Sequence, residues 1–380
     1  MDRIQIASPS FGEEELIAIQ DPIKTGWLTQ GKHVKKFEDD FAAIHDVKYA
    51  LATSSCTTAL HLMLAAAGIG PGDEVIVPSF TWVSTANSVL YCGATPVFVD
   101  IDLDTFNISL EETLKKVTPR TKAVIAVDLF GLCVDIKLFK EKLGPDILVF
   151  EDAACAAGAS LNGNMAGSLS HAAAFSFHPR KSITTGEGGM LTTQNSELAK
   201  IAEKMRNHGA EISEEERHNG PSPYLLPEFN LLGFNYRMTD LQGAIGTAQL
   251  NKLDLFIKER DQMSNYYLEN LSEVKWLSLP MKPKNGVHAW QSYVTRVSHS
   301  GGMKFRNSVM ESLEKNGIAT RPGTHAIHLL GYYANRFGFK PTDYPNSLIA
   351  SETSMAIPLH NQLSTNDQQT VVDTIRNIST

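Results

Sequence analysis

The chain has few cysteines, no long apolar run and no excess of positive charge, and each shortage excludes a class of protein. Four cysteines in 380 residues are widely spaced, without a CxxC pair or a zinc-ligand spacing, which predicts free thiols in a reducing cytoplasm and no metal site. No apolar run is long enough to cross a bilayer, and the N-terminus lacks a signal-peptide pattern. The formal net charge of −8 argues against non-specific binding of nucleic acid. We therefore expect a cytoplasmic protein that binds neither membranes nor nucleic acid.

What remains is the composition of an ordinary globular protein. Hydrophobic residues make up 42% of the chain and charged residues 20%. A chain of 380 residues can bury a sizeable core and hold two domains. The pattern predicts a large domain over residues 1–250, N-terminal segment included, and a small α+β domain over 251–380. One long helix over 239–271 is expected to join them.

Short apolar runs alternate with stretches of helical periodicity between residues 49 and 151. Such alternation predicts an α/β fold, with a mostly parallel sheet covered by helices on both faces. Functional groups in such sheets gather at the carboxyl ends of the strands, where Trp82, Asp128 and Asp152 fall. The predicted strands are 49–53, 74–78, 95–100, 123–129 and 148–151, and the predicted helices include 12–23, 59–67, 81–92, 110–116 and 136–143.

The stretch FSFHPRKSITTGEGGML places Lys181 at the tip of a predicted strand–loop–strand unit. Pro179 ends the first strand because it has no N–H to give, and three glycines turn the chain back into a second apolar run. A lysine held in a partly dry pocket loses proton affinity and can act as an amine nucleophile toward a carbonyl. The alternative is an ordinary loop lysine beside a glycine turn.

Asp152 follows the apolar run 147–150 and precedes the small-residue run AACAAGAS. A carboxylate at a buried strand end needs a cationic or hydrogen-bonding partner, and small residues beside it leave room for a flat group. A buried structural ion pair is the alternative.

A strand feeds a helix through the hydroxyl-rich turn Ser54–Thr58. Hydroxyls and free backbone N–H groups at a helix N-terminus are how a phosphate is captured. The alternative is a plain Ser or Thr N-cap.

These features together predict a site for pyridoxal 5'-phosphate (PLP). PLP needs a lysine for its Schiff base, an acid for its pyridinium nitrogen, a helix N-terminus for its phosphate and usually an aromatic ring against its face. The chain offers one candidate for each role: Lys181 for the Schiff base, Asp152 for the acid, the turn Ser54–Thr58 for the phosphate and Trp82 for the aromatic ring.

The sequence also resembles the DegT/StrS-type sugar aminotransferases, within the fold-type I PLP enzymes, over nearly its whole length. The resemblance implies a large domain with a mostly parallel sheet and a small α+β C-terminal domain. It rests on stretches that include GWLTQGKHVKKFE, SSCTTALHL, FEDAACAAGA, FSFHPRKSITTGEGGM and NYRMTDLQGAIGTAQL. The combination EDAA…FSF(x)3K(x)4GEGG is highly specific.

The resemblance assigns roles to individual residues. Lys181 would hold PLP, Asp152 would contact the pyridinium nitrogen, and Trp82 and Ala154 would lie against the two ring faces. The other implied contacts are Thr57, Thr58 and Ser176 to the phosphate, Asn235 to the phosphate from the partner subunit, and His178, Arg237 and His325 to the substrate. A homodimer with shared active sites follows from the role of Asn235.

This chain departs from the pattern of many relatives at three places. Cys56 and Thr58 stand in the phosphate turn where glycine or alanine is common. Cys155 stands where glutamine or histidine is common, so a hydrogen bond to the cofactor or sugar could be lost. The loop RPGTHAIH differs from the loops associated with any one sugar substrate, so the group that His325 would contact stays open.

The implied function is transfer of an amino group from L-glutamate, with release of 2-oxoglutarate, to a nucleotide-linked keto-deoxysugar. A 4-keto-6-deoxy sugar of amino-sugar, O-antigen or other surface-glycan biosynthesis is expected. Lys181 would move the substrate proton as general base and acid. Two alternatives are a PLP-dependent sugar dehydratase, in whose members histidine replaces the lysine, and a non-catalytic regulatory protein of the same fold.

Overall fold

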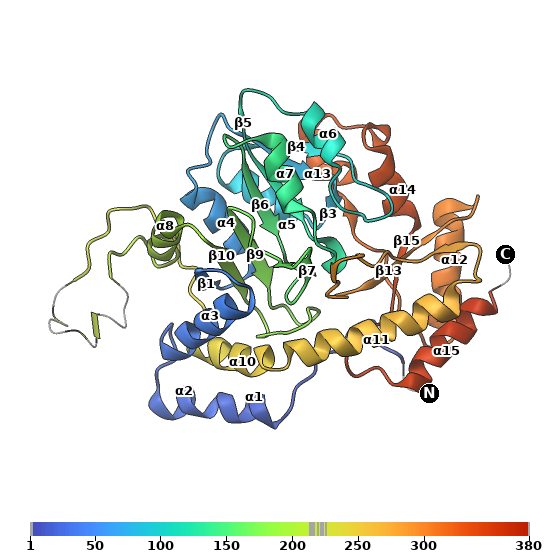
Figure 1. Ribbon diagram of the computed structural model, residues 1–380, viewed down its shortest axis with the longest axis horizontal. Coiled ribbons are helices and arrows are strands. Elements are labelled where there is room, and N and C mark those ends of the chain that lie inside the picture. Colours follow the sequence, from blue (N-terminus) through green and yellow to red (C-terminus); the bar gives the residue numbers. More distant parts are fainter. Residues whose placement is uncertain (1–2, 213–216, 219, 221–223, 225, 379–380) are drawn as a thin grey trace.

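A computed structural model describes residues 3–212, 217–218, 220, 224 and 226–378. A seven-stranded sheet forms its centre, in the order β1-β10-β9-β6-β5-β2-β4 (Figure 1). Only β10 runs against its neighbours, so the prediction of a mostly parallel sheet is confirmed. In sheet order the strands are Tyr49–Thr53, Gly189–Thr193, Ala172–Ser176, Leu148–Asp152, Thr121–Val127, Glu74–Pro78 and Thr95–Val99.

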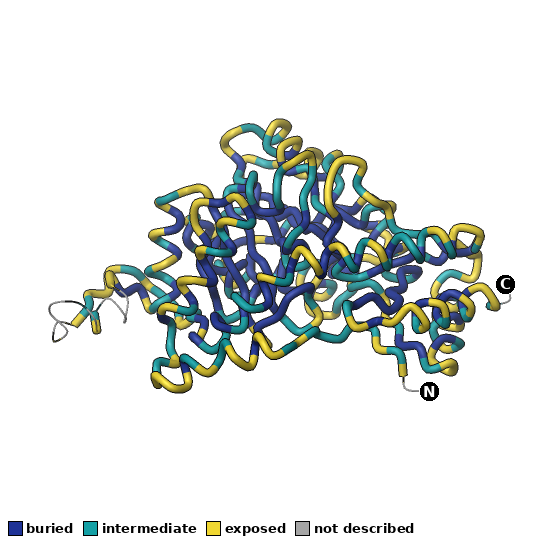
Figure 2. Tube along the Cα trace, turned by 60° about the horizontal axis from the view of Figure 1, so that its bottom comes forward, coloured by how far each residue is buried: buried dark blue, intermediate teal, exposed yellow. Residues whose placement is uncertain are grey.

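Helices cover both faces of this sheet, because its strands are apolar on both sides. In β9, Ala172 and Ala174 face a cluster with α4, α5 and α8, whereas Ala173 and Phe175 face a cluster with α3 and α10. Figure 2 shows buried residues gathered along these strands and exposed ones along the outer turns. The covering helices are α3 (Lys32–Ile44), α4 (Cys56–Ala66), α5 (Ser84–Tyr91), α6 (Leu110–Lys115), α7 (Ile136–Leu143), α8 (Ser196–Arg206) and α10 (Asp240–Leu250).

The N-terminal helix predicted over 12–23 is two short helices, α1 (Glu13–Ala18) and α2 (Gln20–Thr25). Pro22 has no N–H to donate to the carbonyl of Ala18, so the ladder of hydrogen bonds is interrupted there.

The long helix predicted over 239–271 is likewise divided, into α10 and α11 (Leu253–Leu271). The amide of Lys252 donates to Gln249 O at 3.0 Å, which closes a tighter turn than the α-helix and ends α10. The Lys252 ammonium then pairs with Glu15 at 2.6 Å and holds α1 at this break.

The C-terminal part is built around a three-stranded antiparallel sheet, in the order β11-β13-β15. α11 runs from below the large sheet toward α15 and this small sheet (Figure 1). The domain limits at 250 and 251 remain a prediction, because the break at the end of α10 does not by itself define two domains. The elements are β11 (Leu277–Ser278), β12 (Gly286–Val287), β13 (Tyr293–Val297), α12 (Gly302–Lys315), β14 (His325–Ala326), α13 (Gly331–Phe337), α14 (Pro345–Thr353), β15 (Ser354–Ile357) and α15 (Thr365–Arg376).

Short strand pairs join the two parts. β14 pairs with β3 (Phe80–Thr81), and β12 pairs with β7 (Ser160–Leu161), which also pairs with β8 (Asn164–Met165). No helix among the described residues is long and apolar enough to cross a membrane.

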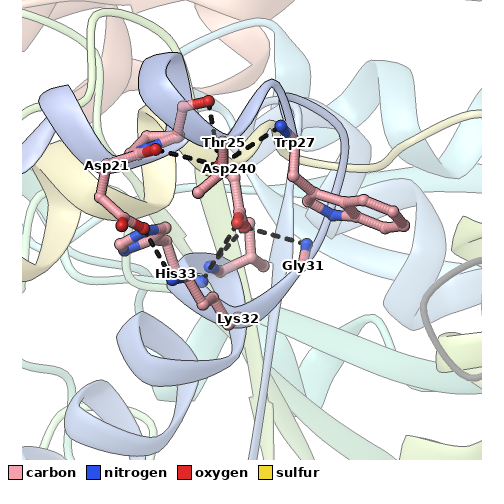
Figure 3. Close-up of polar contacts among 9 residues, drawn as sticks. Asp21, Thr25, Trp27, Gly31, Lys32, His33 and Asp240 are labelled. Atoms are coloured by element: carbon pink, nitrogen blue, oxygen red, sulfur yellow. Dashed lines mark hydrogen bonds and ion pairs between the residues drawn. The ribbon is translucent and has the colours of Figure 1, made fainter. Parts of the chain in front are cut away.

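A buried carboxylate at the start of α10 fixes the loop that leads into α3 (Figure 3). Asp240 is fully buried, and its Oδ1 accepts hydrogen bonds from the amides of Gly31 at 2.9 Å and Val34 at 3.0 Å. Its Oδ2 accepts from the amide of His33 at 3.3 Å. Asp240 therefore caps α3 across 206 residues of sequence and satisfies amides that α3 itself cannot pair. Trp27, on this loop, donates from its indole Nε1 to the carbonyl of Gln30 at 3.3 Å, and its ring lies 5.3 Å from that of His218.

Candidate active site

Asp152 and Lys181 come from neighbouring parallel strands. β6 and β9 are paired in register, with Asp152 opposite Ala174, and β9 ends at Ser176, five residues before Lys181. Because the carboxyl ends of parallel strands meet at one edge of a sheet, the two turns that follow lie side by side. The structure thus brings together the two residues that the sequence analysis made central.

The Asp152 carboxylate is buried, with 3% of the residue exposed, on the face covered by α4 and α5. Thr85 of α5 donates a hydrogen bond of 2.7 Å to its Oδ2, and the amide of Ala154 donates one of 3.3 Å to its Oδ1. Burial raises the pKa of Asp152, although Thr85, the Lys181 ammonium and the Ala154 amide act in the opposite direction. The expected hydrogen-bonding partner is therefore a threonine rather than a charged group.

Lys181 reaches back to the turn that follows Asp152, where its Nζ donates to Cys155 Sγ at 3.2 Å. The expected loss of proton affinity is wrong for the protein without cofactor. Burial lowers the pKa of Lys181, but Cys155, Cys56 and Asp152 outweigh burial and raise it above its ordinary value. The error arose because these three acidic neighbours are distant from Lys181 in sequence.

The N-terminus of α4 carries both features considered for it. Ser55 caps the helix by accepting from the amide of Thr58 at 3.2 Å, and the amide of Ser55 donates to Thr58 Oγ1 at 3.0 Å. The Thr58 hydroxyl thus closes a capping box. Among the described residues, the amides of Cys56 and Thr57 have no hydrogen-bond partner. The helix therefore presents two free N–H groups, as an anion site requires.

Ser176 reaches this helix terminus through its strand partner, Gly189. Ser176 is opposite Gly189 in the β9–β10 pair, and a Cβ on Gly189 would lie 2.5 Å from the carbonyl carbon of Ser55. Only glycine permits such a close approach of two backbones. The predicted phosphate contacts Thr57, Thr58 and Ser176 are thus gathered around one helix end.

Trp82 and His325 come together through the β3–β14 pair, in which Thr81 is opposite His325. Their ring centroids are 5.5 Å apart and the planes make an angle of 67°. Trp82 is 59% exposed, which is high for a tryptophan side chain. Its free face is available to a planar ligand.

The remaining predicted residues are spread around this edge. His178 is half-buried, burial lowers its pKa, and its Nδ1 accepts from the amide of Arg180 at 3.2 Å. Arg237 donates to Asn207 Oδ1 at 2.7 Å and has no carboxylate partner among the described residues. Asn235 is exposed, and the carbonyl of its neighbour Tyr236 accepts from the Ser54 amide at 2.9 Å. The backbone at Asn235 therefore lies beside the phosphate turn of its own chain.

A second carboxyl pair lies behind Asp152, on the opposite face of the sheet. Asp128 and Glu151 are 0% and 2% exposed, and Asp128 Oδ2 has no hydrogen-bond partner among the described residues. Burial raises the pKa of both groups, and the charge of Glu151 raises that of Asp128 further. Burial and the neighbouring charge of Glu151 therefore both favour the protonated form of Asp128.

Glu151 also lines a cavity of about 270 Å³ on this opposite face, with Cys133, Lys137 and Asn164 among the other lining residues. Neither Lys181 nor Asp152 lines it. Cavity volume alone would therefore have directed attention to the wrong face of the sheet.

Sequence reasoning missed Thr85, the Cys155–Lys181 contact and the anchoring of the lysine loop by α10. Gln242 Nε2 donates to the carbonyl of Glu187 at 2.7 Å, which ties the glycine turn after Lys181 to the start of α10. The only signal for Thr85 was a polar residue on the apolar face of its helix. The other two contacts carry no local signal.

The residues present fit PLP. Three kinds of group lie on the same face and edge of the sheet. They are a lysine amine, a buried carboxylate that ends the adjoining strand and has no salt bridge within the described part of the chain, and two free amides at a helix N-terminus. When bound at such a site, PLP accepts the electrons left by the broken Cα–H bond of an amino acid. In this arrangement Lys181 would hold the aldehyde carbon, Asp152 the ring nitrogen and the N-terminus of α4 the phosphate.

Comparison with known proteins supports this interpretation. Residues 9–376 match the model of the DegT/DnrJ/EryC1/StrS aminotransferase family. The spore coat polysaccharide biosynthesis protein SpsC of Bacillus subtilis is 37% identical over 372 residues, which cover 97% of this chain and 95% of SpsC. The GDP-perosamine synthase of Caulobacter vibrioides is 39% identical over 338 residues, 88% of each chain.

Solved structures give the same result. The PLP form of Spr1654 from Streptococcus pneumoniae superimposes with a TM-score of 0.91 at 27% identity and covers 98% of this chain and 97% of its own. The PMP form of Spr1654, which holds the amine form of the cofactor (pyridoxamine 5'-phosphate), also superimposes with a TM-score of 0.91. The predicted fold class and cofactor are confirmed by these neighbours.

Proposed function

This chain belongs to the DegT/DnrJ/EryC1/StrS aminotransferase family, a family of PLP-dependent sugar aminotransferases, and from this premise we propose its substrates. The amino donor is L-glutamate, which leaves as 2-oxoglutarate. The acceptor is the ketone of a nucleotide-linked keto-deoxysugar, a 4-keto-6-deoxy sugar of surface-glycan or O-antigen biosynthesis. The relative named GDP-perosamine synthase supports a nucleotide sugar, and SpsC supports a polysaccharide pathway.

The observation that carries the proposal is the placement of Lys181 and Asp152 on adjoining strand ends. A free lysine amine can both hold the cofactor and carry a proton from one carbon of the bound substrate to another. Thr85 and Lys181 favour the ionised form of Asp152 against the effect of burial, and an ionised Asp152 would favour a protonated ring nitrogen. A protein without catalysis would need neither group.

Recognition of the anionic acceptor requires positive groups, since the chain as a whole is acidic. Arg237 supplies one, because it has no carboxylate partner among the described residues. His178 and the ring of His325, beside Trp82, are the further proposed substrate contacts. Thr57, Thr58 and Ser176 are the proposed phosphate contacts, and Ala154 the contact on the second ring face.

We further propose a homodimer with shared active sites, in which Asn235 reaches the phosphate of the partner subunit. Its support is that Asn235 is exposed, so its side chain is open to a partner. The segment that leads to it also exposes apolar side chains, Phe229 at 59% and Leu232 at 85%. Such side chains are typical of a surface that a partner covers.

Borohydride reduction of the purified protein followed by peptide mapping tests the site. A pyridoxyl group on Lys181 is expected, and label on another lysine would overturn the assignment. Lys181→Ala should turn over negligibly, because both anchoring and proton transfer are lost.

The substrate is tested by incubating the PMP form with a panel of nucleotide keto-sugars and following the return of the absorbance of the PLP form. Return with one sugar, after conversion to PMP with L-glutamate, is the expected result. Conversion by L-glutamate without return on any nucleotide sugar would reject the acceptor class and leave the donor intact.

A further inference from the structure

We propose that Cys155 and Lys181 are an oxidation-sensitive pair, in which oxidised Cys155 sulfur bonds to Lys181 Nζ and closes the active site until a thiol reductant reopens it. The regulatory meaning of this bond rests on the proposed role of Lys181. The bond itself rests only on the geometry of the two side chains.

The two reacting atoms already touch. Lys181 Nζ lies 3.2 Å from Cys155 Sγ, and this thiol is the hydrogen-bond partner of the amine among the described residues. The contact follows from the sheet, because Cys155 lies three residues after the end of β6 and Lys181 five residues after the end of β9, its parallel neighbour.

Both turns are held by backbone hydrogen bonds. The amide of Ala156 donates to Ala153 O at 2.9 Å, and the amide of Lys181 donates to His178 O at 2.8 Å. A Cβ on Gly131 would lie 3.1 Å from Cys155 O, so the turn at Cys155 also rests against a neighbouring loop. The sulfur and the nitrogen are therefore kept together rather than meeting by chance.

The other three thiols are protected. Burial raises the pKa of Cys56 and Cys133, and raises that of Cys92 to about 11. Peroxides oxidise the thiolate form, so a raised pKa slows the oxidation of each of these three thiols. Cys155 is half-buried, as are Cys92 and Cys133, but among the described residues it alone has a lysine ammonium within hydrogen-bond distance, the environment typical of reactive cysteines.

The chemistry balances with one equivalent of a peroxide. The thiol and hydrogen peroxide give a sulfenic acid and water, a two-electron oxidation of sulfur with reduction of the peroxide O–O bond. The unprotonated lysine amine then attacks sulfur, an S–N bond forms, and the sulfenic oxygen leaves as water. The product is a sulfenamide, which a thiol reductant cleaves to return the amine and thiol. While the S–N bond persists, Lys181 cannot react with a carbonyl.

Mass spectrometry of the full chain tests this. The protein is treated with a few equivalents of hydrogen peroxide, once as purified with its cofactor and once after dialysis to remove it. In the dialysed sample we expect a loss of about 2 Da, from removal of two hydrogens, and a linked pair of peptides that contain Cys155 and Lys181. Dithiothreitol should restore the original mass. In the sample that keeps its cofactor, Lys181 is bonded to PLP, so the Cys155–Lys181 link should be several-fold less abundant.

Two variants make the result decisive. Cys155→Ser should abolish the loss of mass, and the matched control Cys56→Ser should retain it. A disulfide between Cys56 and Cys155 gives the same mass change but a different peptide pair, and finding it would overturn the proposal. A gain of about 16 or 32 Da on Cys155 without a link, or no change at all, would overturn it equally.

The outcome is independent of the proposed function. If the untreated protein forms no reducible bond between Lys181 and PLP, the proposed function fails, while the peptide link remains measurable. If PLP binds normally and no link forms, only this inference fails.

Discussion

The hydroxyl of Thr85, in the first turn of α5, donates a hydrogen bond of 2.7 Å to Asp152 at the end of β6. The two residues are 67 positions apart, and both are almost fully buried. This bond supports the ionised form of a carboxylate whose burial favours the neutral form. Thr85 is therefore a positioning residue for Asp152, the acid that we propose contacts the cofactor.

Replacing Thr85 with valine keeps the shape of the side chain and removes the hydroxyl. A hydrogen bond to a charged group contributes about 1.5–3 kcal/mol, so we expect kcat to fall by about tenfold or more while the fold is retained. Thr85→Ser is the matched control and should stay close to wild type. Asp152→Asn should lose more activity than Thr85→Val, because an amide cannot stabilise a positively charged ring. Near-normal turnover in Asp152→Asn would mean that another acid contacts the ring.

The Asp128–Glu151 pair should make stability fall as pH rises. The folded-state pKa of Asp128 lies above its unfolded value, so the folded chain holds an extra proton whose stabilisation is present at low pH and is lost as pH rises through the folded pKa. Asp128→Asn keeps an acceptor for the amide of Val134, which donates to Oδ1 at 2.8 Å, and its amide stays neutral beside Glu151 at every pH.

Thermal unfolding between pH 5 and 9 measures the effect. The difference in melting temperature between Asp128→Asn and wild type should shift in favour of the variant as pH rises. Asp135→Asn, which alters the half-buried N-cap of α7, should leave the slope unchanged. Parallel curves for Asp128→Asn and wild type would mean that Asp128 does not hold the extra proton.

His45 should contribute a loss of stability in acid. It is fully buried between Phe41, whose ring is stacked on it at 4.3 Å, and the carbonyl of Ala166, which its Nδ1 contacts at 2.9 Å. Burial lowers its pKa to about 4, below its unfolded value of 6.5. Because the unfolded chain binds the proton more tightly, up to about 3 kcal/mol present above pH 6.5 is lost as pH falls toward 4.

His45→Gln can make similar hydrogen bonds but does not titrate. The variant should be less stable at pH 7, where it lacks the ring stack, and should lose less stability than wild type between pH 6.5 and 4. Denaturant unfolding across this range gives both quantities. An unchanged slope would show that His45 is not the group that titrates.

Asp240 should be the most sensitive polar residue outside the site. Asp240→Ala leaves three amides at the start of α3 without an acceptor, which we expect to cost about 2–4 kcal/mol. Asp240→Asn keeps one acceptor oxygen and should lose roughly half as much. Chemical unfolding of both variants measures the loss, and equal stability of Asp240→Ala and wild type would contradict the capping role.

The shared dimeric site predicts complementation between two inactive variants, Lys181→Ala and Asn235 replaced by a bulky acidic residue. Half of the reassembled dimers should be mixed, and one of the two sites in each should be intact, so about a quarter of wild-type activity should return. Tyr236 O contacts Ser54 within one chain, so the opposite outcome has a physical basis. No recovery from proven heterodimers would place Asn235 and Lys181 in the same subunit's site.

The α/β class, the parallel sheet and the cofactor followed from the sequence because they depend on local patterns. Apolar runs predicted strands buried on both faces, and the small residues around Asp152 and Lys181 predicted two turns at strand ends. The register of Asp152 against Ala174 then places these turns together, as expected of parallel neighbours. Helix limits were less accurate, as the breaks at Ile19 and Asn251 show.

Only the tertiary structure decided the environment of each charged group. Thr85 on Asp152, Cys155 on Lys181 and Asp240 on the start of α3 are contacts between segments 26 to 209 residues apart. The sequence determines which groups can ionise, but the pKa of a buried group depends on what faces it across the fold. For this reason the sequence could propose Lys181 and Asp152 as the central residues, whereas their surroundings, which raise the pKa of Lys181 where burial alone would lower it, came only from the structure.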